Sequence, residues 1–312
     1  MHRFAHAPLL AAALLLCPAP ASAQDQLPER GSEEIVVTGQ RDLESQVSDF
    51  VGALTQAPPR GQLSRFERSL CPAAFGLSES GKQAVAGRLR QLARAVGIEV
   101  GKAGCVPNAL LLVTADKPAL MQGLARRYPH FFTTVSRGEM RRLMKGEGPA
   151  AAWQMQGPML NADGREIAEE EGVAANRTGR TASRISTAVR PQFAAAVVVV
   201  ERSALDGLTT TQLADYAAMR LFARTDPSRL ANSAAPTIVT ILEAPMGSPV
   251  PLTLTEWDLA FLRGLYSGSN NLYAAARRSE IGAQVAGALQ REPGKEEAKT
   301  GAPESAGSPA PR

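Results

Sequence analysis

Hydrophobic positions recur along the chain with helical spacing in some segments and as short continuous runs in others. In residues 80–96, Val85, Leu89 and Leu92 form one apolar stripe with the basic side chains off it, which predicts an amphipathic helix. The runs ALLLVT at residues 109–114 and FAAAVVVVE at residues 193–201 predict buried strands. The remaining patterns predict a strand at residues 65–70 and helices at residues 117–127, 209–223 and 255–266.

The order of these elements, in which strands alternate with helices, indicates an α/β fold. An α+β arrangement of the same elements remains an alternative. Two of the helices are predicted to begin with capping-box spacing, Thr209 with Gln212 and Thr255 with Asp258. The helix that begins after Thr255 has little polar surface, so we expect it to be buried.

A run of four strand-forming residues, Ile35, Val36, Val37 and Thr38, interrupts a polar leader at residues 24–57. These residues predict a short isolated strand, because β-branched side chains favour extended backbone. Residues 42–56 follow with apolar positions at helical spacing and predict a short amphipathic helix.

Breaks in composition divide the rest of the chain into two folded units. Residues 161–184 are acidic and then rich in Gly, Asn and Thr, with few side chains that a core would bury. The predicted organisation is a signal peptide at 1–23, a polar leader at 24–57, a basic α/β domain with one disulfide at 58–160, a linker or mobile loop at 161–184, a second α/β unit at 185–290 and a disordered tail at 291–312.

The first 23 residues have the features of a secretory signal peptide. A basic start precedes an apolar run at residues 8–17 and the small-residue cleavage site Ala21-Ser22-Ala23. The apolar run is shorter than the roughly 20 residues of a permanent transmembrane helix. Lipid attachment to Cys17 is the alternative, but leucines precede this cysteine where small residues are expected. We therefore expect an exported protein that is periplasmic or secreted.

Removal of the signal peptide leaves two cysteines, Cys71 and Cys105. An even number of cysteines in an oxidising compartment predicts one structural disulfide. The alternatives are a nucleophilic thiol, which needs one free cysteine beside a base, and a redox pair, for which Cys-x-x-Cys spacing is expected. The sequence contains neither arrangement.

Positive charge is concentrated in one part of the chain. The whole chain has a formal net charge of +4, and residues 60–145 hold fifteen Lys and Arg against five Asp and Glu. This basic half is expected to be a solvated surface, with contact to an anionic membrane surface as the alternative. No aromatic residues are interleaved for base stacking, so we do not expect nucleic acid as a partner.

Candidate catalytic chemistry is sparse. His130 is the only histidine after the signal peptide, which excludes sites with two histidine ligands and leaves a Ser-His-Asp triad dependent on this one residue. We predict no catalytic residue, no metal site and no cofactor. Asp215, within LADYAAMRLF, is expected to be a structural hydrogen-bonding aspartate, with a catalytic carboxylate as the alternative. Glu256 and Asp258 are expected to be first-turn residues of a helix.

Two segments resemble known families. EEIVVTGQR, residues 33–41, resembles the segment after the signal peptide of many TonB-dependent outer-membrane receptors of sphingomonads and caulobacters, where it is or adjoins the TonB box. The segments LADYAAMRLFA, PTIVTILE and LTEWDLAFLRGLY resemble the C-terminal part of uncharacterised exported alphaproteobacterial proteins, some of which look like zinc-peptidase relatives. The helix in which that resemblance would place the metal ligands contains no histidine, so it implies at most a non-catalytic relative.

These observations favour a non-enzymatic, exported binding or interaction protein. The resemblance to the TonB box implies that Ile35, Val36, Val37 and Thr38 add as a strand to a periplasmic partner protein. Pairing with an edge of this protein's own sheet, or no role for the segment, are the alternatives. A hydrolase with an unrecognised carboxylate-based site, or a degenerate peptidase-like protein, is the alternative. An envelope-associated protein that uses its basic half against lipid or glycan is a third hypothesis.

Overall fold

The computed structural model describes residues 32–55, 57, 61–170, 172–230, 233–245 and 247–291. The chain separates into two compact units, residues 1–40 and 41–312, and the sheet and its helices belong to the second. The signal peptide predicted for residues 1–23 lies outside the described residues. The same holds for the disordered tail predicted for residues 291–312, apart from Arg291.

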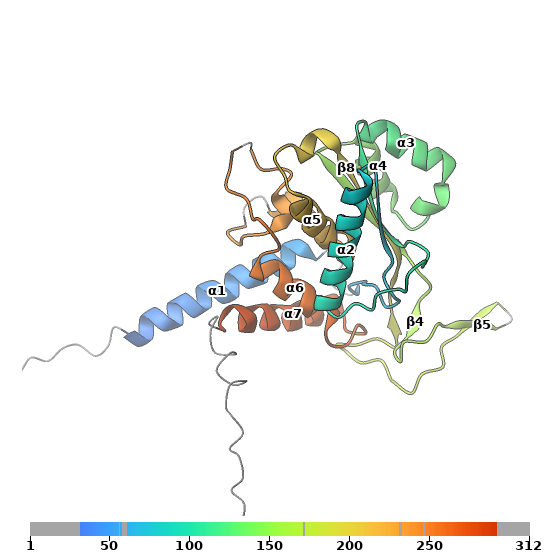
Figure 1. Cartoon of the computed structure of the whole chain (residues 1–312). Helices are drawn as coiled ribbons and strands as arrows, with labels where there is room; N and C mark the ends of the chain where they lie inside the picture. Colours follow the sequence, from blue (N-terminus) through green and yellow to red (C-terminus); the bar gives the residue numbers. More distant parts are fainter. Residues whose placement is uncertain are drawn as a thin grey trace, which may run out of the picture. The chain divides into compact units, whose positions relative to one another are not determined.

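A four-stranded mixed sheet forms the centre of the second unit (Figure 1). Its strands are β1 (Pro72–Phe75), β2 (Ala109–Thr114), β8 (Phe193–Glu201) and β3 (Ala150–Gln156), in the spatial order β1-β2-β8-β3. The first three strands are parallel, and β3 pairs antiparallel with β8 at one edge of the sheet. The α/β fold class is therefore confirmed, as are the strands predicted at residues 109–114 and 193–201.

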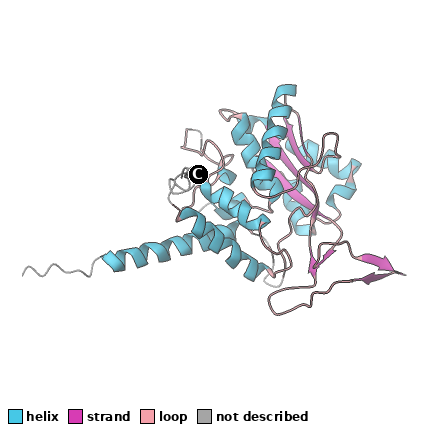
Figure 2. Cartoon of the chain, turned by 60° about the horizontal axis from the view of Figure 1, so that its bottom comes forward, coloured by secondary structure: helices cyan, strands magenta, loops and turns pink. Residues whose placement is uncertain are grey.

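Helices cover both faces of this sheet, because the central strand β8 is apolar on both sides. Val198 and Val200 lie in a core shared with α2 (Glu79–Ala95), α5 (Thr210–Phe222), α6 (Glu256–Tyr266) and α7 (Ala274–Leu289). Val197 and Val199 face a smaller core with α3 (Lys117–Arg127), η1 (Pro129–Phe132) and α4 (Arg137–Lys145). Figure 2 shows the strands between these two groups of helices. The continuous apolar run of β8 is thus that of a strand buried on both faces.

The predicted capping boxes at Thr209 and Thr255 are both present. The carboxylate of Asp258 also accepts hydrogen bonds from the hydroxyl of Thr237, at 2.5 Å, and from the N–H of Ile238, at 2.9 Å. Burial raises the pKa of Asp258, although these hydrogen bonds oppose the rise. Asp258 is therefore a first-turn helix residue, as predicted, and it also fixes η4 (Ile238–Thr240) to the start of α6.

The strand predicted at Ile35 to Thr38 is wrong, because these residues lie in α1 (Ser32–Leu54). An isolated strand has no partner for its backbone groups, whereas a helix satisfies them within the segment. The predicted helix at residues 42–56 corresponds to the C-terminal part of α1. Phe50, in that part, is fully buried and packs edge-to-face against Trp257, with ring centroids 5.3 Å apart.

The predicted division into two α/β units is also wrong. Strand β8 comes from the second predicted unit but lies between β2 and β3 of the first, so residues 58–160 and 185–290 share one sheet. The predicted linker at residues 161–184 contributes to two short ribbons. These ribbons pair β4 (Leu160–Asn161) with β7 (Val189–Arg190) and β5 (Ala168–Glu170) with β6 (Val173–Ala175).

Asn161 explains why the predicted linker has a regular structure. Its buried side chain accepts hydrogen bonds from the N–H groups of Asp163 and Arg165, both at 2.9 Å, and donates to the carbonyl of Arg177 at 2.8 Å. A polar segment is ordered here by a side chain that bonds to its backbone. The strand predicted at residues 65–70 is absent: only isolated bridges occur, from Arg65 to Gln192 and from Leu70 to Val100.

The predicted disulfide joins Cys71 to Cys105, with 6.0 Å between the two Cα atoms. It ties the start of β1 to the loop before β2. A Cβ atom at Gly101 would lie 2.9 Å from Sγ of Cys105, which is closer than real contacts allow, so this loop requires glycine beside the bridge. The disulfide prediction is confirmed.

Candidate binding pocket

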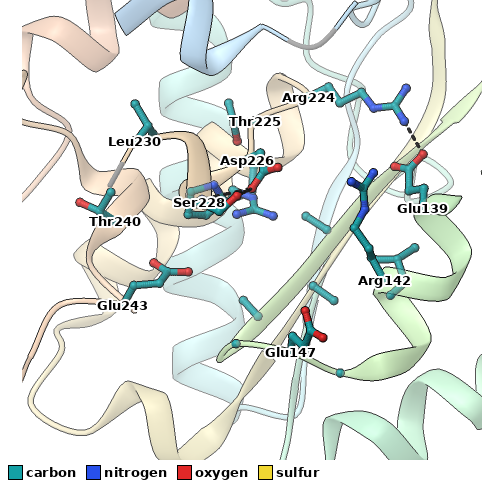
Figure 3. A pocket seen from close by; sticks show the side chains of 18 of the residues that line it. Glu139, Arg142, Glu147, Arg224, Thr225, Asp226, Ser228, Leu230, Thr240 and Glu243 are labelled. Atoms are coloured by element: carbon teal, nitrogen blue, oxygen red, sulfur yellow. Dashed lines mark hydrogen bonds and ion pairs between the residues drawn. The ribbon is translucent and has the colours of Figure 1, made fainter. Parts of the chain in front are cut away.

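A pocket of about 750 Å³ lies along the outer edge of β3 (Figure 3). Ala150, Ala151, Ala152 and Gln154 of β3 line its base. One wall comes from α4 and the turn after it. The other wall comes from the C-terminal end of α5 and from η3 (Pro227–Leu230) and η4, which follow it. The pocket therefore lies where no further strand continues the sheet.

Two buried polar groups in the α5 wall are without a partner. Arg220 is 6 % exposed; its Nη1 donates to the hydroxyl of Tyr216 at 3.4 Å, but no described residue accepts a hydrogen bond from its Nε. Thr225 is 7 % exposed, and within the described chain its Oγ1 also has no partner. Both residues line the pocket. Each therefore keeps an unsatisfied hydrogen-bonding group, an N–H in Arg220 and a hydroxyl in Thr225, beside the pocket.

Gln154 fixes the end of α5 against the sheet. Its Nε2 donates to the carbonyls of Arg220, at 2.8 Å, and Ala223, at 3.2 Å. The last carbonyls of a helix have no partner within the helix, so a side chain from another element can satisfy them. This contact holds the backbone of Arg220 beside β3 and so fixes the position of its Cα atom in the pocket wall.

The α4 wall carries one acidic and one basic side chain, Glu139 and Arg142. Glu139 forms an ion pair with Arg224, which comes from the segment after α5. Arg142, one turn further along α4, is exposed and has no ion pair within the described chain. Figure 3 shows Glu139 and Arg142 on one side of β3, and Thr225, Asp226 and Ser228 on the other. Arg142 therefore places a basic group on the α4 wall, and Arg220 and Arg224 place basic groups on the wall at the end of α5.

Two acidic residues complete the polar lining. Asp226 accepts hydrogen bonds from Ser228, at 2.7 Å from the hydroxyl and 3.1 Å from the N–H. Glu243 lies at the rim; the surrounding protein displaces water from its carboxyl group and so raises its pKa, and the charge of Asp226 adds to the rise. Arg220 acts in the opposite direction. Protonation of Glu243 therefore increases the net positive charge around Arg220.

A buried lysine holds the turn from which β3 starts. Lys117 is fully buried, and its Nζ donates to the carbonyl of Gly146 at 3.0 Å, of Glu147 at 3.4 Å, and of Gly148. Burial lowers the pKa of its amino group, and the charge of Glu201 opposes that change. The three carbonyls belong to the turn between α4 and β3, which lines the pocket. Lys117 thus fixes the position of one rim.

Asp215 lies outside the pocket and has a structural role. Its fully buried carboxylate accepts two hydrogen bonds from Arg88, at 2.7 and 3.0 Å. It also accepts from the hydroxyl of Thr253 at 2.5 Å and from the N–H of Leu254 at 2.8 Å. Both oxygens of the carboxylate are engaged in joining α2, α5 and the segment before α6. The hydrogen-bonding role expected for Asp215 agrees with this geometry, and a catalytic role at this residue does not.

The other sequence-derived candidates are not among the residues that line the pocket either. His130 is in η1, a 3-10 helix, and does not line the pocket. Ile35 to Thr38 lie in α1, and their proposed contact with a partner stays a prediction. The described residues contain no group of three or more His, Cys, Asp and Glu side chains able to hold a metal ion. No helix in the described ranges is long and apolar enough to cross a membrane.

Sequence reasoning missed this pocket, although one signal was present. Arg220 follows Met219 and precedes Leu221 and Phe222 in a helix segment that is otherwise apolar, and all four residues are buried. An arginine at such a position indicates a paired charge or a binding site. Comparisons with models of protein families, with curated proteins and with solved structures found no match for this chain.

Proposed function

We propose that this chain is a non-enzymatic, exported binding protein whose pocket recognises a ligand through a carboxylate group. The observation that carries this proposal is the pair of buried, unpartnered groups at Arg220 and Thr225. A buried polar group without a partner costs about 1–3 kcal/mol, and a charged group costs more. A carboxylate accepts from guanidinium and hydroxyl donors, so its binding would remove that cost.

The composition of the lining supports binding over catalysis. The hydroxyl of Ser228 donates to Asp226, and the lining residues include no histidine or lysine to act as its base. A carboxylate-based hydrolase is the second candidate, favoured by Glu243, because the protein displaces water from its carboxyl group and raises its pKa, as a general acid requires. Turnover of a bound ester or amide that is abolished by Glu243→Gln would favour this second candidate.

Arg220→Gln is expected to weaken binding of a simple carboxylate probe, N-acetyl-aspartate amide, by about thirtyfold. Truncation of one member of a buried, hydrogen-bonded charge pair costs about 2 kcal/mol or more. The probe is titrated into the protein while the side-chain Nε–H signals of arginine are followed by NMR. The Arg220 signal should shift on binding, because its Nε–H gains an acceptor.

Arg141→Gln is the matched control, since Arg141 is an exposed arginine of α4 that does not line the pocket. It should bind the probe as the wild type does. Equal affinity of wild type and Arg220→Gln, or a shift confined to other arginines, would contradict the proposed recognition of the carboxylate by Arg220.

The affinity for the same probe is expected to fall as the pH rises from about 5. Glu243 is exposed, but the protein around its carboxyl group displaces part of the water and holds its pKa above the ordinary value of 4.5; Arg220 opposes this rise and Asp226 adds to it. As the pH rises through this raised pKa, Glu243 becomes an anion that competes with the probe for Arg220. A charge interaction of about 1 kcal/mol corresponds to an affinity loss of about fivefold.

Binding is measured between pH 5 and 8, where the probe carboxylate stays ionised. Glu243→Gln should bind with nearly constant affinity over this range. Between the ordinary pKa of Glu243 and its raised pKa, the folded protein retains a proton that the unfolded chain has lost, so Glu243 should also make the wild type less stable as the pH rises through that interval. A wild-type affinity that is independent of pH would contradict the role given to Glu243.

A further inference from the structure

The outer edge of β3 carries unpaired backbone groups. The N–H of Glu201 donates to the carbonyl of Pro149 at 2.9 Å, which identifies Pro149 and Glu201 as a hydrogen-bonded antiparallel pair. Such pairs alternate along an antiparallel ladder, so Ala151 and Trp153 also direct their N–H and C=O groups toward β8. The backbone groups of Ala150, Ala152 and Gln154 must therefore point away from β8.

A second contact confirms this alternation. Gln156 is the next residue in the outward series, and its N–H donates to the hydroxyl of Thr134 at 3.1 Å. By contrast, within the described residues no hydrogen bond reaches the outward N–H or C=O groups of Ala150, Ala152 and Gln154. The register shift in β3 occurs only after Met155, so the edge from Ala150 to Gln154 is regular. This edge offers a ladder of three donors and three acceptors.

The surroundings of this edge fit one extended chain. All three residues line the pocket, so the edge lies at its base. Arg142 on α4 and Ser228 in η3 stand on opposite sides of β3 (Figure 3). These walls flank the edge on both faces of the sheet, so a chain that pairs with it would lie between them. Alanine at positions 150 and 152 also lets a second backbone come close.

We propose that the outer edge of β3 binds an extended peptide segment of another protein as an added strand, with an acidic side chain of the peptide reaching Arg220. The acidic contact rests on the proposed function, and the strand pairing is additional to it. The side chains of Ala150 and Ala152 lie on the same face of the sheet as the core around α5. Side chains of an added strand on that face would point toward the end of α5, where Arg220 lies.

The test uses the blocked peptide acetyl-Thr-Val-Asp-Val-Thr-amide and compares it with N-acetyl-aspartate amide by calorimetry. Successive residues of a strand direct their backbone groups to opposite sides. Two analogues are therefore made, one methylated on the aspartate nitrogen and one on the nitrogen of the valine that follows. We expect the parent peptide to bind at least about tenfold more tightly than the single amino acid, through its added hydrogen bonds.

One of the two methylated peptides should lose about tenfold or more in affinity, and the other should bind like the parent. In the protein, Ala152→Pro removes the outward N–H of residue 152 without removing a hydrogen bond to β8. This variant should no longer bind the peptide but should still bind N-acetyl-aspartate amide. Ala152→Ser retains the N–H and should bind both molecules.

Different failures separate the two proposals. If N-acetyl-aspartate amide binds but the peptide gains nothing over it, or both methylated peptides bind like the parent, the added strand is refuted and the carboxylate site stands. If neither molecule binds, the proposed function fails as well. A concentration-dependent dimer in sedimentation experiments that Ala152→Pro abolishes and the peptide does not displace would assign the edge to a second copy of the chain, and would overturn the proposal.

Discussion

Asp215→Ala is expected to lower the free energy of unfolding by about 4 kcal/mol. The carboxylate is fully buried and accepts four hydrogen bonds, two of them from Arg88. Its removal leaves a partly buried guanidinium and the N–H of Leu254 without their acceptor. Removal of one member of a buried ion pair costs about 3–5 kcal/mol, because the remaining partner stays desolvated. Urea unfolding followed by circular dichroism measures the change.

Asp206→Ala is the matched control, because Asp206 is an exposed aspartate shortly before α5. Its removal should change the free energy of unfolding by less than about 0.5 kcal/mol. Asp215→Asn should be less damaging than Asp215→Ala, since it retains an acceptor for Leu254 and Thr253. A loss below about 1 kcal/mol in Asp215→Ala would show that Asp215 does not hold α2 and α5 together.

The double variant Cys71→Ala with Cys105→Ala is expected to lose about 3–4 kcal/mol of stability. The two cysteines are separated by 34 residues, and in the chain-entropy model a loop of this length gives that stabilisation by restricting the unfolded chain. The variant should still fold, because Asn108 holds the same region. Its side chain accepts from the N–H of Cys71 at 2.7 Å and donates to the carbonyl of Ser69 at 3.1 Å.

The loss is measured by urea unfolding of the variant beside oxidised wild type. Denatured, unreduced wild type should contain no free thiol from this pair, and reduced wild type should unfold at the same urea concentration as the variant. A stability difference below about 1 kcal/mol would mean that the unfolded chain is not restricted by the bridge.

Local patterns predicted those parts of the fold that are determined by neighbouring residues. The helix at Lys117–Arg127, the capping boxes at Thr209 and Thr255, and the strand β8 each depend on a few consecutive positions, and each prediction is confirmed. The strand predicted at Ile35 to Thr38 is wrong because β propensity depends on a neighbouring strand, which an isolated segment does not have.

The parts that sequence reasoning missed depend on contacts between distant segments. Two units were predicted because residues 161–184 are polar, but that polarity is satisfied locally by Asn161, and the chain returns to the sheet at β8. The pocket combines residues near Glu139, Gln154, Arg220 and Glu243, which only the fold brings together. A search for histidine, cysteine and known motifs also overlooks a site in which arginine and threonine are the main groups.

The position of β8 also has a consequence for how this protein folds. β2 pairs with β8 across the 78 residues that separate Thr114 from Phe193, so the chain must close a long loop before the central pair of strands forms. Contacts between residues distant in sequence slow folding. Until β8 arrives, β2 and β3 each expose an edge that is later paired, and apolar residues on both faces are uncovered. Folding of the first 192 residues alone therefore cannot complete the sheet, and nascent chains pass through a stage that is prone to aggregation.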